Sequence, residues 1–219
     1  MRPTLYYSRN PNPRLAVAVA RYLDAPVDLE WAAPLAPDQV ERFRPLNPSL
    51  RVPILVEREV QAEGDALWEA DAIACRLSQL VGSDFWRTGG PDAPDMIRWV
   101  SWAKCNFMHS CDIVHFERGT KPRYGLGAID QGEIARGLAM FHEGAAILEA
   151  RLNRRDWLLA SGISYADFRM AAFLPFNDVA KLPLADYPAV AAWNERLMGI
   201  AAWADPFAGL RAPELPPVR

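Results

Sequence analysis

The chain has 219 residues, of which 51% are apolar and 23% are charged. This composition is typical of a globular protein with one large or two small domains, and it excludes an intrinsically disordered chain. The formal net charge of −3 provides no basic field that would attract nucleic acid or anionic lipid, so we expect neither partner.

The three cysteines are too few and too scattered for a disulfide framework, and no cluster of cysteine and histidine suggests a metal site. The first residues, MRPTLYYSRNPNPR, lack the apolar core of a signal peptide. No apolar run approaches the ~18 residues that a membrane span requires. We therefore expect reduced cysteines, no metal and a cytoplasmic location.

In chain order, the first elements alternate between strand and helix. Short apolar runs predict strands, and the small apolar residues of RLAVAVARYL predict a helix that packs on a sheet. A polar hairpin, REVQAEGDA, precedes the last helix of this part. The predicted order is β-α-β-α-β-(β)-α, with strands at 4–7, 27–31 and 53–57 and helices beginning at 13, 37 and 69.

After residue 81 the pattern changes to helices alone. A connection rich in glycine and proline, VGSDFWRTGGPDAP, marks the boundary between two domains. We predict domains at 1–82 and 92–219, the second all-helical. Its predicted helices span residues 95–116, 130–151, 167–180 and 189–199.

The turn between the first strand and the first helix, SRNPNPR, carries the strongest chemical signal. Asn is a favoured N-cap and Pro a favoured first helical residue, so we place Asn12 at the cap and Pro13 inside the helix. A helix start binds an anion, a phosphate or a thiolate. The alternative is that Asn10 and Asn12 only shape the turn and cap the helix.

Two further segments carry alternatives of the same kind. The Val52-Pro53 bond precedes a strand; a cis bond there would present the Val52 backbone to an extended peptide, whereas a trans bond would be an ordinary strand start. Glu69 and Asp71 open a helix, where they either complement the helix dipole or bind a ligand ammonium group.

Together, several segments resemble the glutathione transferase family. TLYYSRNPNPR is similar to the family's first strand and active-site turn, NPSLRVPIL to its cis-proline segment, and LWEADAI to its γ-glutamyl-binding turn. SYADFRMAAFLP resembles its capping box, in which Ser164 would cap a helix and Asp167 would reach back to the cap. LADYPAVAAWNERLMGIAAW is similar to the family's ending.

The resemblance implies an α+β two-domain fold, with a thioredoxin-like domain followed by an all-α helical-bundle domain, and it implies a homodimer that binds glutathione. Val52 would pair with the cysteinyl backbone before cis-Pro53, Arg51 would lie near the glycyl carboxylate, and Glu69 with the backbone of Ala70 would hold the γ-glutamyl end. Ala70 replaces the family's usual serine, which removes one hydrogen bond.

The catalytic position is open among four residues. Most classes of the family use tyrosine, serine or cysteine, but Asn10-Pro11-Asn12 is similar to the T-P-N turn of nu-like bacterial members. Asn10 and Asn12 are therefore our first expectation for stabilising the thiolate, and Ser8 and Tyr7 remain alternatives. Because neighbouring strand residues point to opposite faces, only one of Tyr6 and Tyr7 can face the site.

For the second substrate the resemblance implies an apolar pocket lined by the start of the helical domain, with Trp102 and Asn106 among its residues. The expected function is a glutathione transferase that adds the thiolate to a small apolar electrophile. Two alternatives remain on the same fold: a glutathione-dependent disulfide or peroxide reductase, and a catalytically silent glutathione-binding module.

Overall fold

The computed structural model describes residues 2–57 and 66–218, and contacts divide the chain into two compact units. Unit 1 comprises Met1–Trp86 and Ala201–Glu214, and unit 2 comprises Arg87–Ile200 and Leu215–Arg219. The polar hairpin predicted around residues 58–66 lies almost entirely outside the described residues.

Within its described residues, unit 1 contains a four-stranded sheet in the order β2-β1-β3-β4. β1 pairs in parallel with β2, while β3 is antiparallel to both β1 and β4. The three strands with predicted ranges lie within one residue of them, the fourth strand was predicted without bounds, and the element order is confirmed. The strands are β1 (Thr4–Tyr7), β2 (Asp28–Trp31), β3 (Ile54–Val56) and β4 (Ala66–Trp68).

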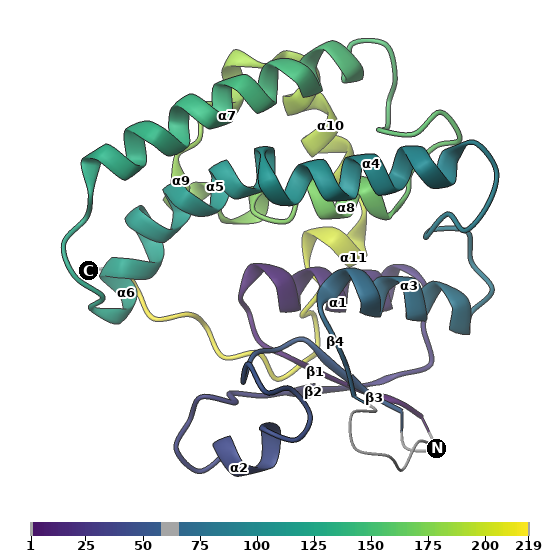
Figure 1. The fold of residues 1–219 in the computed structure, drawn as a ribbon, viewed down its shortest axis with the longest axis vertical. Coiled ribbons are helices and arrows are strands. Elements are labelled where there is room, and N and C mark those ends of the chain that lie inside the picture. The colour runs from purple at the N-terminus through teal and green to yellow at the C-terminus, as the bar shows by residue number, and fades with distance from the viewer. Residues whose placement is uncertain (1, 58–65, 219) are drawn as a thin grey trace. The chain divides into compact units, whose positions relative to one another are not determined.

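Helices cover both faces of this sheet (Figure 1). Tyr6 and Tyr7 follow each other in β1, so their rings point to opposite faces. Tyr6 packs edge-on against Phe43 of α2, and Tyr7 packs with Val17 of α1. The helices of this part are α1 (Pro11–Tyr22), α2 (Val40–Phe43) and α3 (Ala70–Leu80).

Residues 201–214 pack with unit 1 through α11 (Ala201–Ala204) and the chain that follows it. α11 contacts α1, where the buried Arg14 guanidinium lies over the Trp203 ring. Farther along, Phe207 is stacked on Tyr7. The sequence predicts these residues as part of the helical domain, but their apolar contacts are with the sheet and α1, which helical periodicity does not encode.

Unit 2 is helical in all of its described residues that form regular structure. The predicted helix over residues 95–116 is wrong as one element, because the chain breaks at Asn106, where φ is −127° and ψ is −99°. Asn106 donates its side-chain amide to the Trp102 carbonyl, and such local bonding by Asn competes with helix continuation. The two helices are α4 (Asp92–Cys105) and α5 (Phe107–His115).

The helix predicted over 167–180 is also shorter than expected. Its N-terminus is confirmed, since the Ser164 and Asp167 capping box is present at the start of α8 (Tyr165–Met170). Pro175 lies in the 3-10 turn η2 (Leu174–Phe176), where its missing N–H prevents a continuous α-helix. Unit 2 further contains α9 (Asn177–Ala180), η3 (Leu184–Asp186) and α10 (Pro188–Met198).

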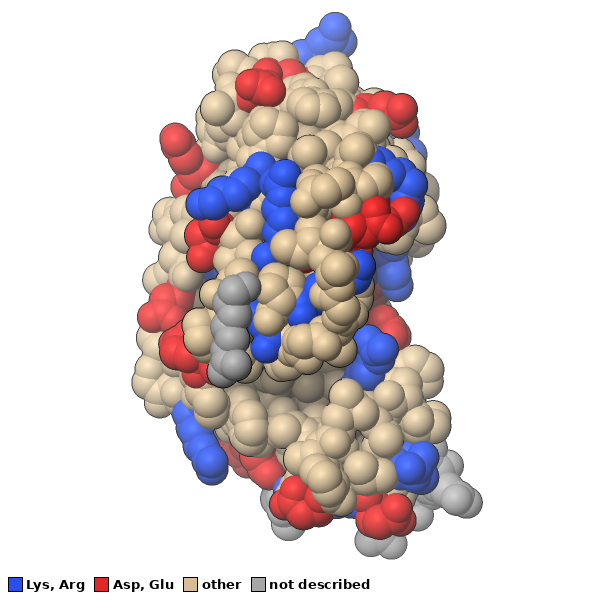
Figure 2. All heavy atoms as spheres, turned by 90° about the vertical axis from the view of Figure 1, so that its left-hand side faces the viewer, with Lys and Arg blue, Asp and Glu red and all other residues tan. Residues whose placement is uncertain are grey.

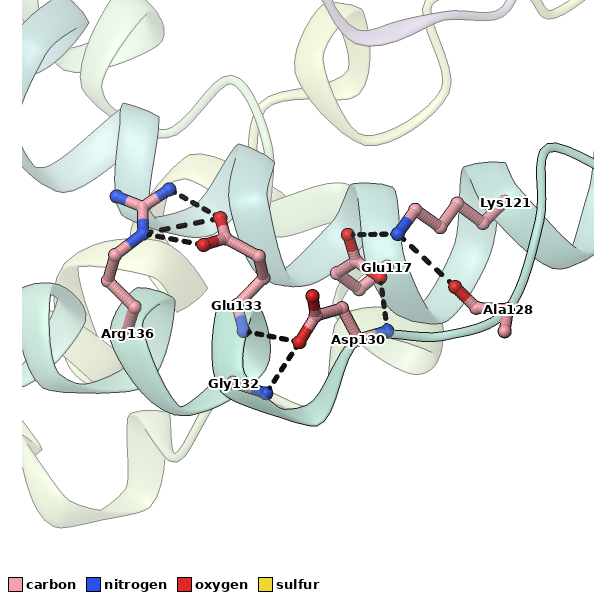
Figure 3. Close-up of polar contacts among 7 residues, drawn as sticks. All are labelled: Glu117, Lys121, Ala128, Asp130, Gly132, Glu133 and Arg136. Carbon is pink, nitrogen blue, oxygen red and sulfur yellow. Dashed lines mark hydrogen bonds and ion pairs between the residues drawn. The ribbon is translucent and has the colours of Figure 1, made fainter.

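A polar network holds the connection from α5 to the long helix α7 (Gln131–Leu152) (Figure 3). Glu117 is buried in the π-helix η1 (Phe116–Thr120), where it pairs with Lys121 of α6 (Lys121–Tyr124) and accepts the Asp130 N–H at 2.8 Å. Asp130 then caps α7 by accepting the N–H groups of Gly132 and Glu133. This network fixes where α7 begins.

Candidate functional site

The pairing of the sheet brings the three predicted glutathione-binding segments to one edge of unit 1. Ile54 is opposite Tyr6 of β1 and opposite Trp68 of β4. Beyond this row, β1 continues through Tyr7 to Ser8, β3 is entered from Pro53, and β4 leads into Glu69. Because adjacent strands are about 4.8 Å apart, the active-site turn, the proline segment and the start of α3 are neighbours.

The helix start at this edge differs from the prediction. α1 begins at Pro11, and its N-cap is Asn10, with φ −64° and ψ 159°, not Asn12. The first of the two prolines takes the favoured first helical position, which moves the cap two residues upstream. Since Pro11 and Pro13 lack N–H groups, Asn12 is the one residue among the first three of the helix that carries a backbone donor.

The side chain of Asn10 does not cap the helix. Its amide nitrogen donates a hydrogen bond to the hydroxyl oxygen of Ser8 at 3.2 Å, and this contact is exposed. Within the described residues the Ser8 hydroxyl donates to no partner, so its hydrogen is available for an anion. The exposed Asn12 side chain lies one residue into the helix.

Tyr7 is placed in the core of unit 1. Its side chain is 1% exposed, and its hydroxyl donates to the carbonyl of Arg211 at 2.8 Å. Burial raises the pKa of the Tyr7 phenol, against the opposing effect of Arg21 and Arg9. The hydroxyl is therefore used for a structural contact.

The Val52-Pro53 peptide bond is cis, which is one of the two alternatives that the sequence left open. Buried Asn47 holds the preceding loop: its amide nitrogen donates to the Arg51 carbonyl at 2.8 Å, and its oxygen accepts from the N–H and hydroxyl of Ser49. Asn47 is thus a positioning residue that the motifs do not indicate, although Asn47-Pro48 is a turn signal.

Glu69 precedes α3 with φ 73° and ψ 125°, a backbone region that residues with a Cβ rarely adopt. Its side chain is exposed, whereas that of Ala70 is buried. Such strained residues concentrate at ligand-binding sites. The positive φ of Glu69 therefore supports a ligand-binding role for this turn, and it does so independently of the motif resemblance.

The two predicted residues of the helical half are neighbours in unit 2. Trp102, half-buried in α4, packs edge-on against Trp99 with ring centroids 5.7 Å apart. Asn106 donates its amide to the Trp102 carbonyl at 2.9 Å. The Asn106 side chain thus closes the end of α4 and fixes the backbone of Trp102.

On the face that Figure 2 shows, basic and acidic side chains both occur. Among residues 2–57 and 66–218, no group of three histidine, cysteine or acidic side chains is arranged to hold a metal ion. The three cysteines are free. No helix in the described part of the chain is long and apolar enough to cross a bilayer.

Comparison with known proteins gives a family match in unit 2. Residues 131–196 match the model of the glutathione S-transferase C-terminal domain. The fold is that of the thioredoxin-like and all-α domains expected from the sequence, and it matches a structure of glutathione S-transferase I bound with lactoylglutathione. That match has a TM-score of 0.78 and 20% identity, and it covers 95% of this chain and 99% of the other.

Two relatives with known names are similar over most of the sequence. FtsZ-localized protein A of Caulobacter vibrioides is 27% identical over 164 residues, which cover 71% of this chain and 69% of that protein. Glutathione S-transferase-like protein LUC7 of a Fusarium species is 26% identical over 205 residues, covering 87% and 86%. The resemblance of the sequence motifs to this family is thereby confirmed.

Proposed function

We propose that this chain, which its C-terminal domain match and its fold assign to the glutathione S-transferase family, binds glutathione at the sheet edge of unit 1 and transfers its thiolate to a small apolar electrophile. The observation that carries the proposal is the Ser8–Asn10 pair at that edge. It places a hydroxyl hydrogen and an amide beside the cis-proline segment and the strained Glu69 turn.

In this proposal Ser8 donates its hydroxyl hydrogen to the sulfur, and Asn10 orients Ser8 by donating to its oxygen. The thiol proton is released to water. An ordinary thiol with a pKa of about 8.5 must fall by one to two units to be mostly thiolate at pH 7, which requires about 1.4–2.7 kcal/mol. One hydrogen bond to a charged group supplies roughly 1.5–3 kcal/mol, so no titratable base is needed.

The N-terminus of α1 contributes less to thiolate stabilisation than we expected from the sequence. Pro11 and Pro13 remove two of the N–H groups that a helix usually offers an anion. Asn12 retains its place in the proposal because it supplies both a backbone N–H and a side-chain amide in the first turn. Tyr7 is replaced as a candidate by Ser8, because its hydroxyl is bonded to Arg211.

The rest of the tripeptide follows the same edge. The Val52 backbone pairs with the cysteinyl residue, Arg51 attracts the glycyl carboxylate, and Glu69 receives the γ-glutamyl ammonium group. Asn47 supports this arrangement by holding the Arg51 carbonyl. For the electrophile we retain Trp102 and Asn106 as contacts.

One observation favours a second function, a silent glutathione-binding module. Ala70 has no hydroxyl at the start of α3, which weakens the hold on the γ-glutamyl carboxylate. One relative is named for its localisation with FtsZ and not for a reaction. In both functions we expect a cytoplasmic homodimer that binds glutathione.

Turnover separates these functions. Calorimetry with reduced glutathione tests binding, and assays with an aryl halide, an isothiocyanate and an enone test conjugation. Binding with conjugation above the uncatalysed rate supports the transferase, and binding without it supports the silent module. Reduction of hydroxyethyl disulfide without conjugation would support the reductase, and absence of binding would refute all three.

A further inference from the structure

The chain returns to the candidate site near its C-terminal end. Residues 207–214, which we term the strap, lie against the end of β1 and the turn that follows it (Figure 1, yellow). Phe207 is stacked on Tyr7 with ring centroids 5.7 Å apart, and the Tyr7 hydroxyl donates to the Arg211 carbonyl. The strap is thus attached to the last residue of β1, immediately before Ser8.

Arg9 makes the second attachment, through three contacts. Its Nε donates to the Ala212 carbonyl at 2.7 Å, and its Nη2 lies 2.6 Å from Oε1 of Glu214. Its guanidinium carbon is 5.1 Å from the centroid of the Phe207 ring. The Arg9 side chain is only 28% exposed. A planar guanidinium that bonds and stacks at once has few alternative rotamers, so it fixes its own backbone.

Arg9 also separates the two residues that form the proposed thiolate contact. Ser8 and Asn10 are bonded to each other, while Arg9 between them is directed to the strap. The chain bends at Arg9 and Asn10, and the Arg9 side chain contacts the strap while those of Ser8 and Asn10 contact each other. Fixing Arg9 on the strap therefore fixes the short backbone segment that joins Ser8 to Asn10.

We propose that Arg9, anchored by the strap, is a positioning residue that keeps Ser8 and Asn10 aligned for the thiolate. This inference rests on the proposed function for its chemistry. It adds that residues 207–214 set the acidity of the bound thiol although none of their side chains is required to touch the sulfur. A charge-assisted hydrogen bond depends steeply on geometry, so a small misalignment lowers thiolate stabilisation.

The test compares Arg9→Met, Arg9→Lys and Glu214→Gln with a matched control, Arg42→Met. Arg42 also belongs to unit 1, pairs with Glu30 and lies over the aromatic rings of Tyr6 and Phe43. The ultraviolet absorbance of the thiolate of bound glutathione, titrated with pH, gives the thiol pKa. The pH profile of kcat/KM gives the same quantity in turnover.

In Arg9→Met we expect a bound-thiol pKa about 0.5–1 unit higher than in the unsubstituted protein. kcat/KM at pH 6.5 then falls about threefold to tenfold but returns towards the original value at pH 9, where either protein holds a thiolate. Arg9→Lys and Glu214→Gln keep part of the attachment, so their bound-thiol pKa and kcat/KM should lie between those of Arg9→Met and the unsubstituted protein. A loss of folding in Arg9→Met would lower kcat/KM equally at every pH and would appear in the free energy of unfolding of that variant, whereas Arg42→Met shows the effect of removing an arginine of unit 1 that does not contact the strap.

A third readout does not depend on glutathione. In the unliganded protein, the side-chain amide signals of Asn10 in an NMR spectrum should shift in Arg9→Met and stay in place in Arg42→Met. Unchanged Asn10 signals, or an unchanged thiol pKa in a protein that binds glutathione, would overturn the positioning role. If the unsubstituted protein binds no glutathione, the proposed function fails, and the Asn10 signals alone decide whether Arg9 positions the turn.

Discussion

The side-chain amide of Asn10 donates to the Ser8 hydroxyl across 3.2 Å. Both residues follow β1, and the pair forms although Asn10 also occupies the N-cap position of α1. An N-cap side chain that bonds backward leaves the N–H groups of the helix start to other acceptors, and here it orients the Ser8 hydroxyl. The pair therefore gives Asn10, a first expectation from the sequence, and Ser8, its alternative, two different proposed roles: Asn10 orients Ser8, and Ser8 donates to the sulfur.

Substituting Ser8 should lower kcat/KM more than substituting Asn10. In Ser8→Ala, the sulfur loses its direct donor, and we expect kcat/KM at pH 6.5 to fall by about 100-fold, as for loss of one preorganised donor. Asn10→Ala should cost less, about tenfold, because it only disorients Ser8. Conjugation kinetics check both, with Ser101→Ala on an exposed part of α4 as the control.

Tyr7→Phe completes the comparison. It removes the bond to the Arg211 carbonyl and should lower the free energy of unfolding by about 1 kcal/mol with little change in the bound-thiol pKa. A large rise in that pKa in Tyr7→Phe, together with an unaffected Ser8→Ala, would return the thiolate contact to Tyr7.

Ala70→Ser should tighten glutathione binding. The new hydroxyl at the start of α3 can donate to the γ-glutamyl carboxylate, a gain of roughly 0.5–1.5 kcal/mol, or about twofold to tenfold in the dissociation constant. Calorimetry measures it, with Ala72→Ser in the same helix as the control. Equal affinities in all three proteins would argue against a γ-glutamyl group at this helix start.

Substitutions of Glu69 should affect stability and binding separately. Glu69→Gly relieves the positive φ of 73° and should raise the free energy of unfolding by about 1 kcal/mol, while it loses the contact with the ammonium group. Glu69→Gln keeps the strain and loses only the charge. Urea unfolding and calorimetry should therefore show weaker binding in both variants but greater stability in Glu69→Gly alone.

Asp24→Gly serves as the backbone control, because Asp24 also has a positive φ, of 47°, at the end of α1. It should leave glutathione affinity unchanged. Full retention of binding in Glu69→Gly and Glu69→Gln would refute the role of Glu69.

His115 should make stability depend on pH. The side chain is 4% exposed, its Nε2 has no hydrogen-bond partner within the described residues, and burial, with Arg123 nearby, lowers its pKa from 6.5 to about 4. Between these values the unfolded chain binds more protons than the folded one. The stabilisation is present above pH 6.5 and is lost as the pH falls to 4, by up to about 3 kcal/mol.

His115→Phe removes this titration and keeps the edge-on contacts with Phe173 and Phe176. Urea unfolding at pH 4.5 and 7.5 should show a smaller loss in the variant. Asp167 acts in the opposite direction, because burial raises its pKa to about 6 and its contribution falls as the pH rises. Both proteins share Asp167, so it cancels in the comparison; equal losses would contradict the assignment to His115.

The fold was predictable where local patterns determine it. β1 occurs at the predicted residues, and the Ser164–Asp167 capping box is present, because alternation and capping are encoded within a few residues. The break at Asn106 was not, because a side chain competing with helix bonds leaves no mark on apolar spacing. The prediction of Asn12 as the cap of α1 was wrong, because each of the two prolines can take the first helical position and the structure has Pro11 there, with Asn10 as the cap.

For the candidate site, the sequence located the segments but not the roles of their residues. Motif spacing placed the turn, the proline segment and the Glu69 turn, and strand pairing brings them to one edge. The direction of the Asn10 amide and the occupation of the Tyr7 hydroxyl depend on contacts with residues two and 204 positions away. The long-range contact of Tyr7 has no local signature, and the local contact of Asn10 competes with helix capping, which residue type alone does not decide.

The attachment of Arg211 to Tyr7 sets a minimum time for the maturation of unit 1 during protein synthesis. The two residues are separated by 204 positions, so the N-terminal strand leaves the ribosome long before its C-terminal neighbour exists. At about 5–20 residues per second, the interval is on the order of 10–40 s. Nascent chains halted before residue 207 should thus carry a sheet whose end is uncovered, a state open to chaperones until translation is complete.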